Sequence, residues 1–270
     1  MRLGISSFTY SWAVGVRGLP PERPLGALAL VERAAALGVK VLQFGDNLPL
    51  ARLPEGEIVA LAERAGALDI SLEVGTRGIA PENLRTYLAL AERLHSPILR
   101  VVIDTAEHRP SEDEAVAMLR GAMPEFERAG VCLAIENHDR FPVRKLARLV
   151  ERVGSEAIGI CLDVANSLGC MEGPQLVLDA LGPLAVNLHL KDFVVRRHWH
   201  NLGFVIEGCP VGEGALDVPW LLSEMRRHGR DVNAILEQWT PPEATLEASI
   251  RKEEAWAEAG VRTLRRYIPG

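Results

Sequence analysis

The sequence is poor in cysteine and aromatic residues and has no long apolar run. Its 270 residues include four cysteines, without a CxxC spacing, so neither a disulfide scaffold nor a zinc knuckle is expected. Cys132 and Cys161 lie inside apolar runs, which favours buried thiols. No apolar run is long enough to cross a membrane and the N-terminus lacks a signal-peptide pattern. We therefore expect a cytoplasmic protein with no membrane partner.

Basic charge and phosphate-binding turns are also scarce. The formal net charge is -6, so a nucleic-acid partner is not expected without a local basic patch. Neither a P-loop nor a GxGxxG turn is present. Hydrophobic residues make up 48% of the chain and charged residues 24%, as in an ordinary globular protein. The length suits one large α/β domain or two small ones.

Short strand-like runs alternate with longer helical ones along the whole chain. The expected strands are 3–8, 39–44, 70–74, 98–103, 131–136, 157–163, 185–190 and 232–237. The expected helices are 23–37, 55–67, 81–94, 111–130, 143–153, 173–181, 218–228 and 243–267. Eight such units predict a single (β/α)₈ TIM barrel over residues 1–270. A doubly wound open sheet is the alternative, but it usually has fewer strands and a Gly-rich turn after the first.

The run AVNLHLKD, residues 185–192, is a strand with two different faces. Its valine and two leucines fall on one face, and Asn187, His189 and Lys191 fall on the other. In a barrel, the apolar face packs on helices while the other face points inward. An edge strand with a solvated polar face would show the same pattern, so the argument depends on the other strands.

Charged side chains stand at the ends of several other expected strands. Reactive groups of a TIM barrel sit at the C-terminal ends of its strands, which here bear Glu73, Arg100, Asp104, Glu136, Asp163, His189 and Glu237. The last four come from four consecutive strands, and three carboxylates meeting at one mouth would repel one another. A divalent cation would offset that repulsion, and oxygen and imidazole ligands suit Mn²⁺, Mg²⁺, Co²⁺ or Zn²⁺. For any one of these residues taken singly, a helix cap or a surface carboxylate is the better interpretation, and the four together favour the metal.

Four short motifs give the sequence a family resemblance. ENH at 136–138, CLDVANS from Cys161, HLKD from His189 and ILEQW ending at Trp239 resemble the xylose isomerase-like barrel superfamily. That superfamily includes ketose 3-epimerases, hydroxypyruvate isomerases, inosose and 3-dehydroshikimate dehydratases, and endonuclease IV. The resemblance implies one divalent metal, with Mn²⁺ preferred, held by Glu136, Asp163, His189 and Glu237. It also implies a homo-oligomer, a dimer or a tetramer.

The resemblance predicts a sugar or sugar-phosphate isomerase or epimerase. In the family's epimerases the residues matching Glu136 and Glu237 move a proton on opposite faces of a ketose, through an enediolate. Two residues favour instead a lyase acting on an inosose or dehydroshikimate-like cyclic ketone. Asn166 stands where many epimerases have histidine, and Lys191 matches members that resemble inosose dehydratases. An AP endonuclease and a non-catalytic sugar-binding barrel are further alternatives.

The expected substrate is a small sugar or polyol derivative. Residues expected to contact it are Trp12, His138, Asn166, Lys191 and Arg197. Trp12 can cover an apolar sugar face, and Asn166 can bind a hydroxyl. Lys191 can hold an oxyanion or form an ion pair with a nearby acid. Arg197 belongs to a long connection, residues 193–215, that we expect to form a lid or specificity loop.

Overall fold

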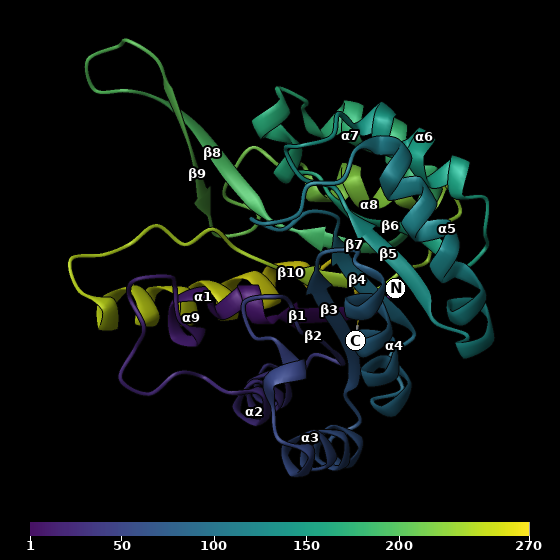
Figure 1. Ribbon diagram of the computed structural model, residues 1–270. Helices are drawn as coiled ribbons and strands as arrows, with labels where there is room; N and C mark the ends of the chain where they lie inside the picture. Colours follow the sequence, from purple (N-terminus) through teal and green to yellow (C-terminus); the bar gives the residue numbers. More distant parts are fainter. Residues whose placement is uncertain (270) are drawn as a thin grey trace.

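The computed structural model describes residues 1–269 and forms a closed barrel of eight parallel strands surrounded by helices (Figure 1). The strand order around the barrel is β1-β10-β7-β6-β5-β4-β3-β2. Parallel neighbours joined by helical crossovers are the arrangement that the alternating pattern predicts. The predicted TIM-barrel fold is therefore confirmed.

The barrel strands are short and the helices that follow them are longer. The strands are β1 Leu3–Ser6, β2 Val41–Gln43, β3 Ser71–Arg77, β4 Ile98–Val102, β5 Cys132–Glu136, β6 Ile158–Asp163, β7 Ala185–Leu190 and β10 Ala234–Leu236. The helices are α1 Ser11–Val14, α2 Ala27–Leu37, α3 Glu55–Ala67, α4 Pro81–Arg93, α5 Glu112–Ala129, α6 Val143–Val153, α7 Pro174–Leu181, α8 Val218–Arg227 and α9 Leu246–Leu264.

Local signals set several helix ends as expected, and two starts differ. Ser111 caps α5 through a capping box with Glu114, and Gly130 ends that helix in the left-handed conformation. The helix expected from residue 23 begins only at Ala27, after the cap residue Gly26. Residue 23 precedes a proline, which disfavours the helical conformation at that position. The helix expected from residue 243 begins at Leu246, after the cap residue Thr245.

The inside of the barrel is polar rather than apolar along part of its height. Outward-facing strand residues such as Leu42 and Leu188 pack in the hydrophobic core with the helices. Among the inward-facing residues, Gln43, Glu73 and Asn187 are fully buried. Buried polar groups must be hydrogen-bonded to one another, so this part of the interior can hold only a defined arrangement of side chains.

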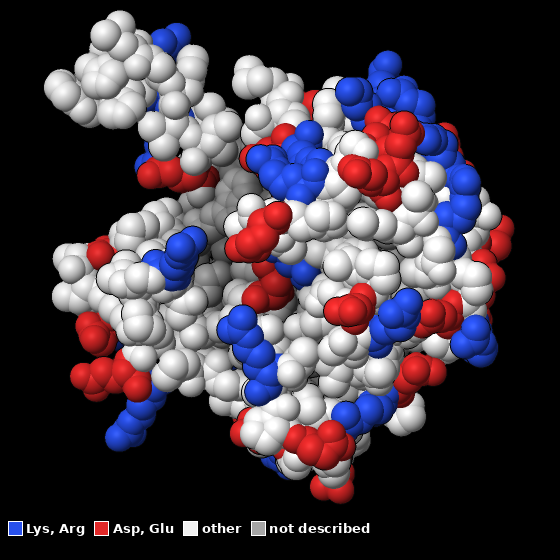
Figure 2. Space-filling model, in the orientation of Figure 1, with Lys and Arg blue, Asp and Glu red and all other residues white. Residues whose placement is uncertain are grey.

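The connection after β7 is a hairpin and not an irregular loop. Strands β8, Asp192–Arg197, and β9, Phe204–Cys209, pair antiparallel and project from the barrel (Figure 1). The hairpin carries exposed apolar side chains, including Trp199, and appears largely uncharged in Figure 2, while acids and bases are interspersed on the barrel face. Because β8 follows β7 directly, the hairpin stands at the C-terminal end of the barrel. The role of residues 193–215 as a lid stays a prediction.

Asp192 fixes the base of this hairpin. Its carboxylate accepts hydrogen bonds from the backbone N–H groups of Gly212, Gly214 and Leu216. These bonds bring the chain leaving β9 back against the start of β8.

Within the described residues, none of the helices combines the length and the apolar character that crossing a membrane would require.

A buried carboxyl group on α9 makes stability depend on pH. Glu253 accepts hydrogen bonds from the backbone N–H groups of Trp12 (2.8 Å) and Ala13 (2.6 Å), and burial raises its pKa from 4.5 to about 7. A raised carboxyl pKa gives stability that is full below the unfolded-state value and is lost as pH rises through the folded-state value. We expect urea unfolding between about pH 5 and pH 8 to show a loss of up to about 3 kcal/mol from this group.

The variant Glu253→Gln cannot titrate and should lose this part of the pH dependence. Glu254→Gln is the matched control, because its neighbouring carboxylate is partly exposed and paired with Arg33. An unchanged pH profile in Glu253→Gln would contradict the assignment.

Candidate metal centre

Four side chains from consecutive strands of the barrel converge at one point. Nδ1 of His189 lies 3.4 Å from Oε2 of Glu237, 3.7 Å from Oε1 of Glu136 and 3.8 Å from Oδ2 of Asp163. One potential ligand atom from each residue lies within 4.8 Å of the others, and all four residues are buried. Residues that end β5, β6, β7 and β10, far apart in sequence, therefore form one cluster.

One atom of this cluster lacks the partner that burial demands. Within residues 1–269, Nδ1 of His189 is buried and makes no hydrogen bond, whereas Oδ2 of Asp163 has the ammonium group of Lys191 at 2.8 Å. Buried polar atoms are normally satisfied, so Nδ1 of His189 is free to coordinate an ion. Three carboxylates and an imidazole are a donor set for a hard or borderline divalent cation. The residues present thus fit a divalent metal ion, whose identity the geometry leaves open.

A buried arginine neutralises one of the carboxylates. Nε of Arg100 forms an ion pair with Glu136, and its Nη1 lies 2.8 Å from Oδ1 of Asp46. Burial alone would raise the pKa of Glu136, but the positive charge of Arg100, together with His189 and His138, holds that pKa well below its usual range. Glu136 is therefore a fixed negative charge and a weak base.

The ammonium group of Lys191 lies between two further carboxylates of the cluster, those of Asp163 and Glu237. Its Nζ lies 2.8 Å from Oδ2 of Asp163, 3.1 Å from Oε2 of Glu237 and 4.9 Å from the centre of the Trp239 ring. Burial would lower the pKa of Lys191, but the two carboxylates raise it above the usual value. Burial likewise opposes ionisation of Glu237, yet His189 and Lys191 bring its pKa down to about 2. Lys191 is thus a permanent cation beside the ligand set.

Two further predicted contact residues border the cluster. Nδ2 of Asn166 donates to Oε1 of Glu136 at 2.8 Å, and its Oδ1 accepts from Nζ of Lys191 at 3.2 Å. Nε2 of His138 lies 3.1 Å from the same Oε1 of Glu136, and the imidazole is partly exposed. The structure brings these residues together with the four candidate ligands. Their contact with a substrate stays a prediction.

The other two predicted contact residues make local contacts elsewhere. Trp12 belongs to α1, and its indole N–H donates to the backbone oxygen of Thr240 at 2.9 Å. The exposed Arg197 lies on β8, where its guanidinium covers the Phe204 ring and donates to the backbone oxygen of Asn201. Neither interacts with the four candidate ligands in the described part of the chain. Their contact with a substrate also stays a prediction.

Uncharged strand-end residues complete the site and were missed in the sequence. Oγ of Ser6, at the end of β1, donates to Oε1 of Glu237 at 2.9 Å. Oε1 of Gln43, at the end of β2, lies 2.7 Å from Nε2 of His189. Ser6 and Gln43 lie at the C-terminal ends of their strands, as do the charged residues that the sequence predicted for the site. Reading strand ends for hydroxyl and amide groups as well as titratable ones would have found them.

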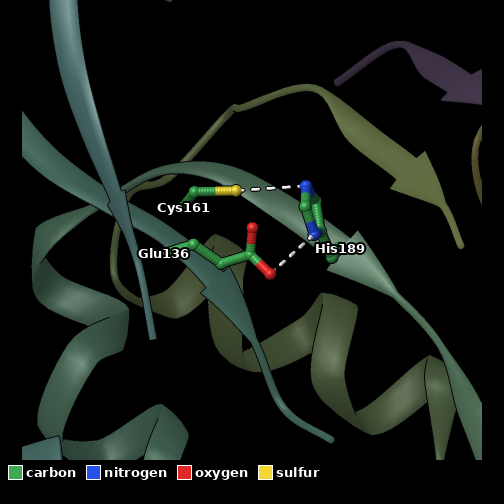
Figure 3. A group of neighbouring side chains, drawn as sticks. All are labelled: Glu136, Cys161 and His189. Atoms are coloured by element: carbon green, nitrogen blue, oxygen red, sulfur yellow. Dashed lines mark hydrogen bonds and ion pairs between the residues drawn. The ribbon is translucent and has the colours of Figure 1, made fainter. Parts of the chain in front are cut away.

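Cys161 lies beside Glu136 and faces the other nitrogen of the imidazole. Figure 3 shows both residues on the same side of His189, with Sγ of Cys161 3.1 Å from Nε2 and the Glu136 carboxylate facing Nδ1. Burial raises the pKa of this thiol to about 11, so it is protonated at neutral pH, as the apolar setting of the strand predicts.

Comparison with known proteins agrees with this architecture. A family profile described as "Xylose isomerase-like TIM barrel" matches residues 31–267. The 3-oxo-isoapionate decarboxylase of Pectobacterium atrosepticum is 36% identical over 264 residues, which cover 98% of this chain and 95% of the relative.

Solved structures share the fold at low sequence identity. A D-psicose 3-epimerase determined in the presence of D-fructose superposes with a TM-score of 0.75 at 14% identity, covering 100% of both chains. A xylose isomerase-like TIM barrel protein from Mycobacterium smegmatis, in complex with magnesium, gives 0.68 at 14% identity and covers 97% of each chain. The predicted family resemblance is confirmed: this chain belongs to the xylose isomerase-like TIM barrel family.

Proposed function

We propose that this protein is a metal-dependent decarboxylase acting on a 3-oxo carbohydrate acid. The single observation that carries the proposal is the pair of buried cations, Arg100 and Lys191, among the candidate ligands. The similarity of nearly the whole chain to a 3-oxo-isoapionate decarboxylase supports the same substrate class. The isomerase or epimerase activity expected from the family resemblance is a prediction that these two cations disfavour.

The charge of the site favours an anionic substrate. Three carboxylates face two permanent cations, Arg100 and Lys191. Asp46, which also pairs with Arg100, is balanced by Arg77, so the set carries a single formal negative charge. A bound divalent ion would change this to a single positive charge. A buried site with a positive charge offsets the cost of removing a carboxylate from water, whereas a neutral ketose gains only the weaker attraction of its oxygen dipoles to that charge.

The contacts of the Glu136 carboxylate favour decarboxylation over epimerisation. An epimerase of the expected kind needs two carboxylates that accept and return a proton. Both oxygens of Glu136 are already engaged, because Oε2 pairs with Arg100 and Oε1 accepts a hydrogen bond from Asn166. Decarboxylation removes no proton from carbon, so it does not require Glu136 to act as a base.

The proposed reaction breaks one carbon–carbon bond. The bond between the carboxylate carbon and C2 of a 3-oxo acid breaks, and carbon dioxide leaves. The electron pair passes from C2 into the neighbouring 3-oxo group, and C2 then takes up one proton to give the ketone. A divalent ion, when bound, supplies Lewis-acid stabilisation of negative charge on a substrate oxygen.

The chain's own residues bind and orient the acid. Glu136, Asp163, His189 and Glu237 would hold the ion, for which we propose Mn²⁺. Lys191 provides a charged hydrogen-bond donor for an anionic oxygen of the substrate. Asn166 lies between Lys191 and Glu136, so its amide is placed to bind a hydroxyl group without transferring a proton.

An assay in D₂O separates the candidate reactions. The Mn²⁺-loaded protein is given 3-oxo-isoapionate, a panel of ketoses, and the cyclic ketones inosose and dehydroshikimate. We expect one carbon dioxide per 3-oxo acid consumed and one deuterium on the carbon that lost the carboxylate. Deuterium entering a ketose without loss of carbon would establish an epimerase instead, and loss of water from a cyclic ketone would establish a dehydratase.

Removing the cationic donor should weaken turnover of the acid. We expect Lys191→Met to lower kcat/KM for the 3-oxo acid about 10- to 100-fold, since a hydrogen bond to a charged group contributes about 1.5–3 kcal/mol. Lys252→Met is the control, because Lys252 pairs with Glu243 on the α9 side of the molecule. Full activity of Lys191→Met would exclude Lys191 from substrate binding.

A further inference from the structure

A buried polar cluster lies behind His189, on the side opposite the carboxylates. Oε2 of Glu73 accepts from Nε2 of Gln43 at 2.9 Å and from Nδ2 of Asn187 at 3.0 Å. Its Oε1 accepts from Nδ2 of Asn233 at 2.7 Å. Gln43, Glu73 and Asn187 are almost completely buried, so water cannot substitute for any of these partners.

The backbone fixes this cluster as firmly as the side chains do. Gln43 and Glu73 are direct partners in the register of β2 and β3. The backbone N–H of Phe44 then donates to the backbone oxygen of Glu73 at 2.8 Å. Because adjacent strands hold the two side chains next to each other, their contact does not depend on a mobile loop.

The carboxylate of Glu73 determines which way each amide points. Both oxygens of Glu73 serve as acceptors, Oε2 for Gln43 and Asn187 and Oε1 for Asn233, so Gln43 turns its NH₂ group toward Glu73. The same NH₂ group donates to Oδ1 of Asn187 at 3.1 Å, which is consistent with Asn187 directing its own NH₂ group at Glu73. The only remaining polar atom of Gln43, Oε1, therefore faces Nε2 of His189 at 2.7 Å.

The direction of this series of hydrogen bonds selects one tautomer of the His189 imidazole. Since Oε1 of Gln43 can only accept, Nε2 of His189 must carry a proton and donate it. Cys161 agrees, because its thiol can donate to Oδ1 of Asn187 at 3.5 Å while its sulfur lies 3.1 Å from the same Nε2 (Figure 3). In the neutral imidazole the lone pair is then on Nδ1, the buried atom that faces the three carboxylates.

We propose that Glu73 and Gln43 are positioning residues that hold His189 as the Nε2–H tautomer and so set the affinity of the site for a divalent metal. They act through His189 and touch neither the metal nor the substrate. Hydrogen bonds behind a metal-binding histidine orient the ring and make it a better ligand, and their loss commonly weakens metal binding 10- to 100-fold. The proposal depends on the metal centre but not on which reaction the centre catalyses.

The test measures metal binding and ring protonation rather than turnover. We expect Gln43→Leu to raise the Kd for Mn²⁺, measured by competition with a fluorescent chelator, about 10- to 100-fold. Glu73→Gln should have a smaller effect, because an amide in that place no longer forces the direction of Gln43. In the wild-type protein loaded with diamagnetic Zn²⁺, long-range ¹H–¹⁵N spectra should show a proton on Nε2 of His189 and the metal on Nδ1.

A swapped double variant separates positioning from simple destabilisation. With Gln43→Glu and Glu73→Gln combined, position 43 again offers an acceptor to Nε2 of His189, now a carboxylate oxygen, and Asn187 can reverse its amide to match. We expect this variant to bind Mn²⁺ within a few-fold of wild type. Leu42→Val is the matched control, since Leu42 neighbours Gln43 but faces the outer core. It should lose stability without losing metal affinity.

Three results would overturn the proposal. The first is metal bound to Nε2 in the wild-type spectrum, which needs no variant. The second is an unchanged Kd in Gln43→Leu. The third is a loss of affinity that follows the free energy of unfolding alone across all variants, including the swap and Leu42→Val. Failure of the decarboxylation assay would leave all three readouts intact, so the two proposals can fail separately.

Discussion

Replacing His189 by Ala is expected to reduce the metal content of the purified protein from about one divalent ion per chain to nearly none. His189 is the only nitrogen donor among the four clustered residues, and its Nδ1 lies between 3.4 and 3.8 Å from an oxygen of each carboxylate. Losing one of four ligands should weaken binding on the order of 100-fold or more, since complete four-ligand sites supply about 10–16 kcal/mol. Elemental analysis after dialysis, with Mn²⁺, Mg²⁺, Co²⁺ and Zn²⁺ offered in parallel, measures this directly.

His138→Ala is the matched control for this experiment. His138 also contacts Glu136, at 3.1 Å, but lies outside the four-residue cluster and is partly exposed. It should retain the ion. Two or three ions per chain in the wild type would favour the endonuclease alternative, and no ion under any loading condition would refute the metal centre.

Replacing Arg100 by Met is expected to lower the free energy of unfolding of the metal-free protein by about 3–5 kcal/mol. The guanidinium and Glu136 are both almost completely buried, and the substitution leaves the carboxylate without its charge partner. An unpaired buried charge costs more than the pair itself contributed. Urea unfolding of the metal-free protein, with and without added Mn²⁺, gives the relevant free energies.

Metal should restore part of the stability lost in Arg100→Met, because the ion offers Glu136 a second source of positive charge. The control is Arg77→Met, which removes the other arginine that pairs with Asp46, at 2.9 Å. Arg77 is about one third exposed, so its loss should cost no more than about 1 kcal/mol. Equal losses in the two variants would show that burial of the Arg100–Glu136 pair is not what makes it important.

Much of the fold follows from local patterns. Alternation of apolar runs with amphipathic helices predicts the eight strand–helix units, and caps such as Ser111 and Gly130 fix helix ends within a residue or two. Parallel strands joined by helices have few ways to close, so the barrel itself is predictable. The hairpin of β8 and β9 was expected only as a long connection, because short strands in a projecting ribbon carry no strong period.

The candidate ligands were also predictable, because the C-terminal ends of all the strands of a TIM barrel lie at the same face. Glu136, Asp163, His189 and Glu237 are found together for that reason, before any distance is known. What their sequence positions could not reveal is which neighbours neutralise them. Arg100 stood out only as a strand-end charge, and Lys191 could equally bind a substrate or pair with an acid.

The sequence by itself determined the barrel, the family and the four residues that meet at its mouth, because the succession of strands and helices along the chain and the alternation of side chains within a strand are local properties. Only the tertiary structure decided that Arg100 neutralises Glu136, that Lys191 lies between Asp163 and Glu237, and that Gln43 directs His189. These contacts join residues up to 146 positions apart, and their energies depend on distance, burial and hydrogen-bond direction. Residue spacing along the chain specifies none of those quantities, so the charge and hydrogen bonding of the site are known only from the tertiary structure.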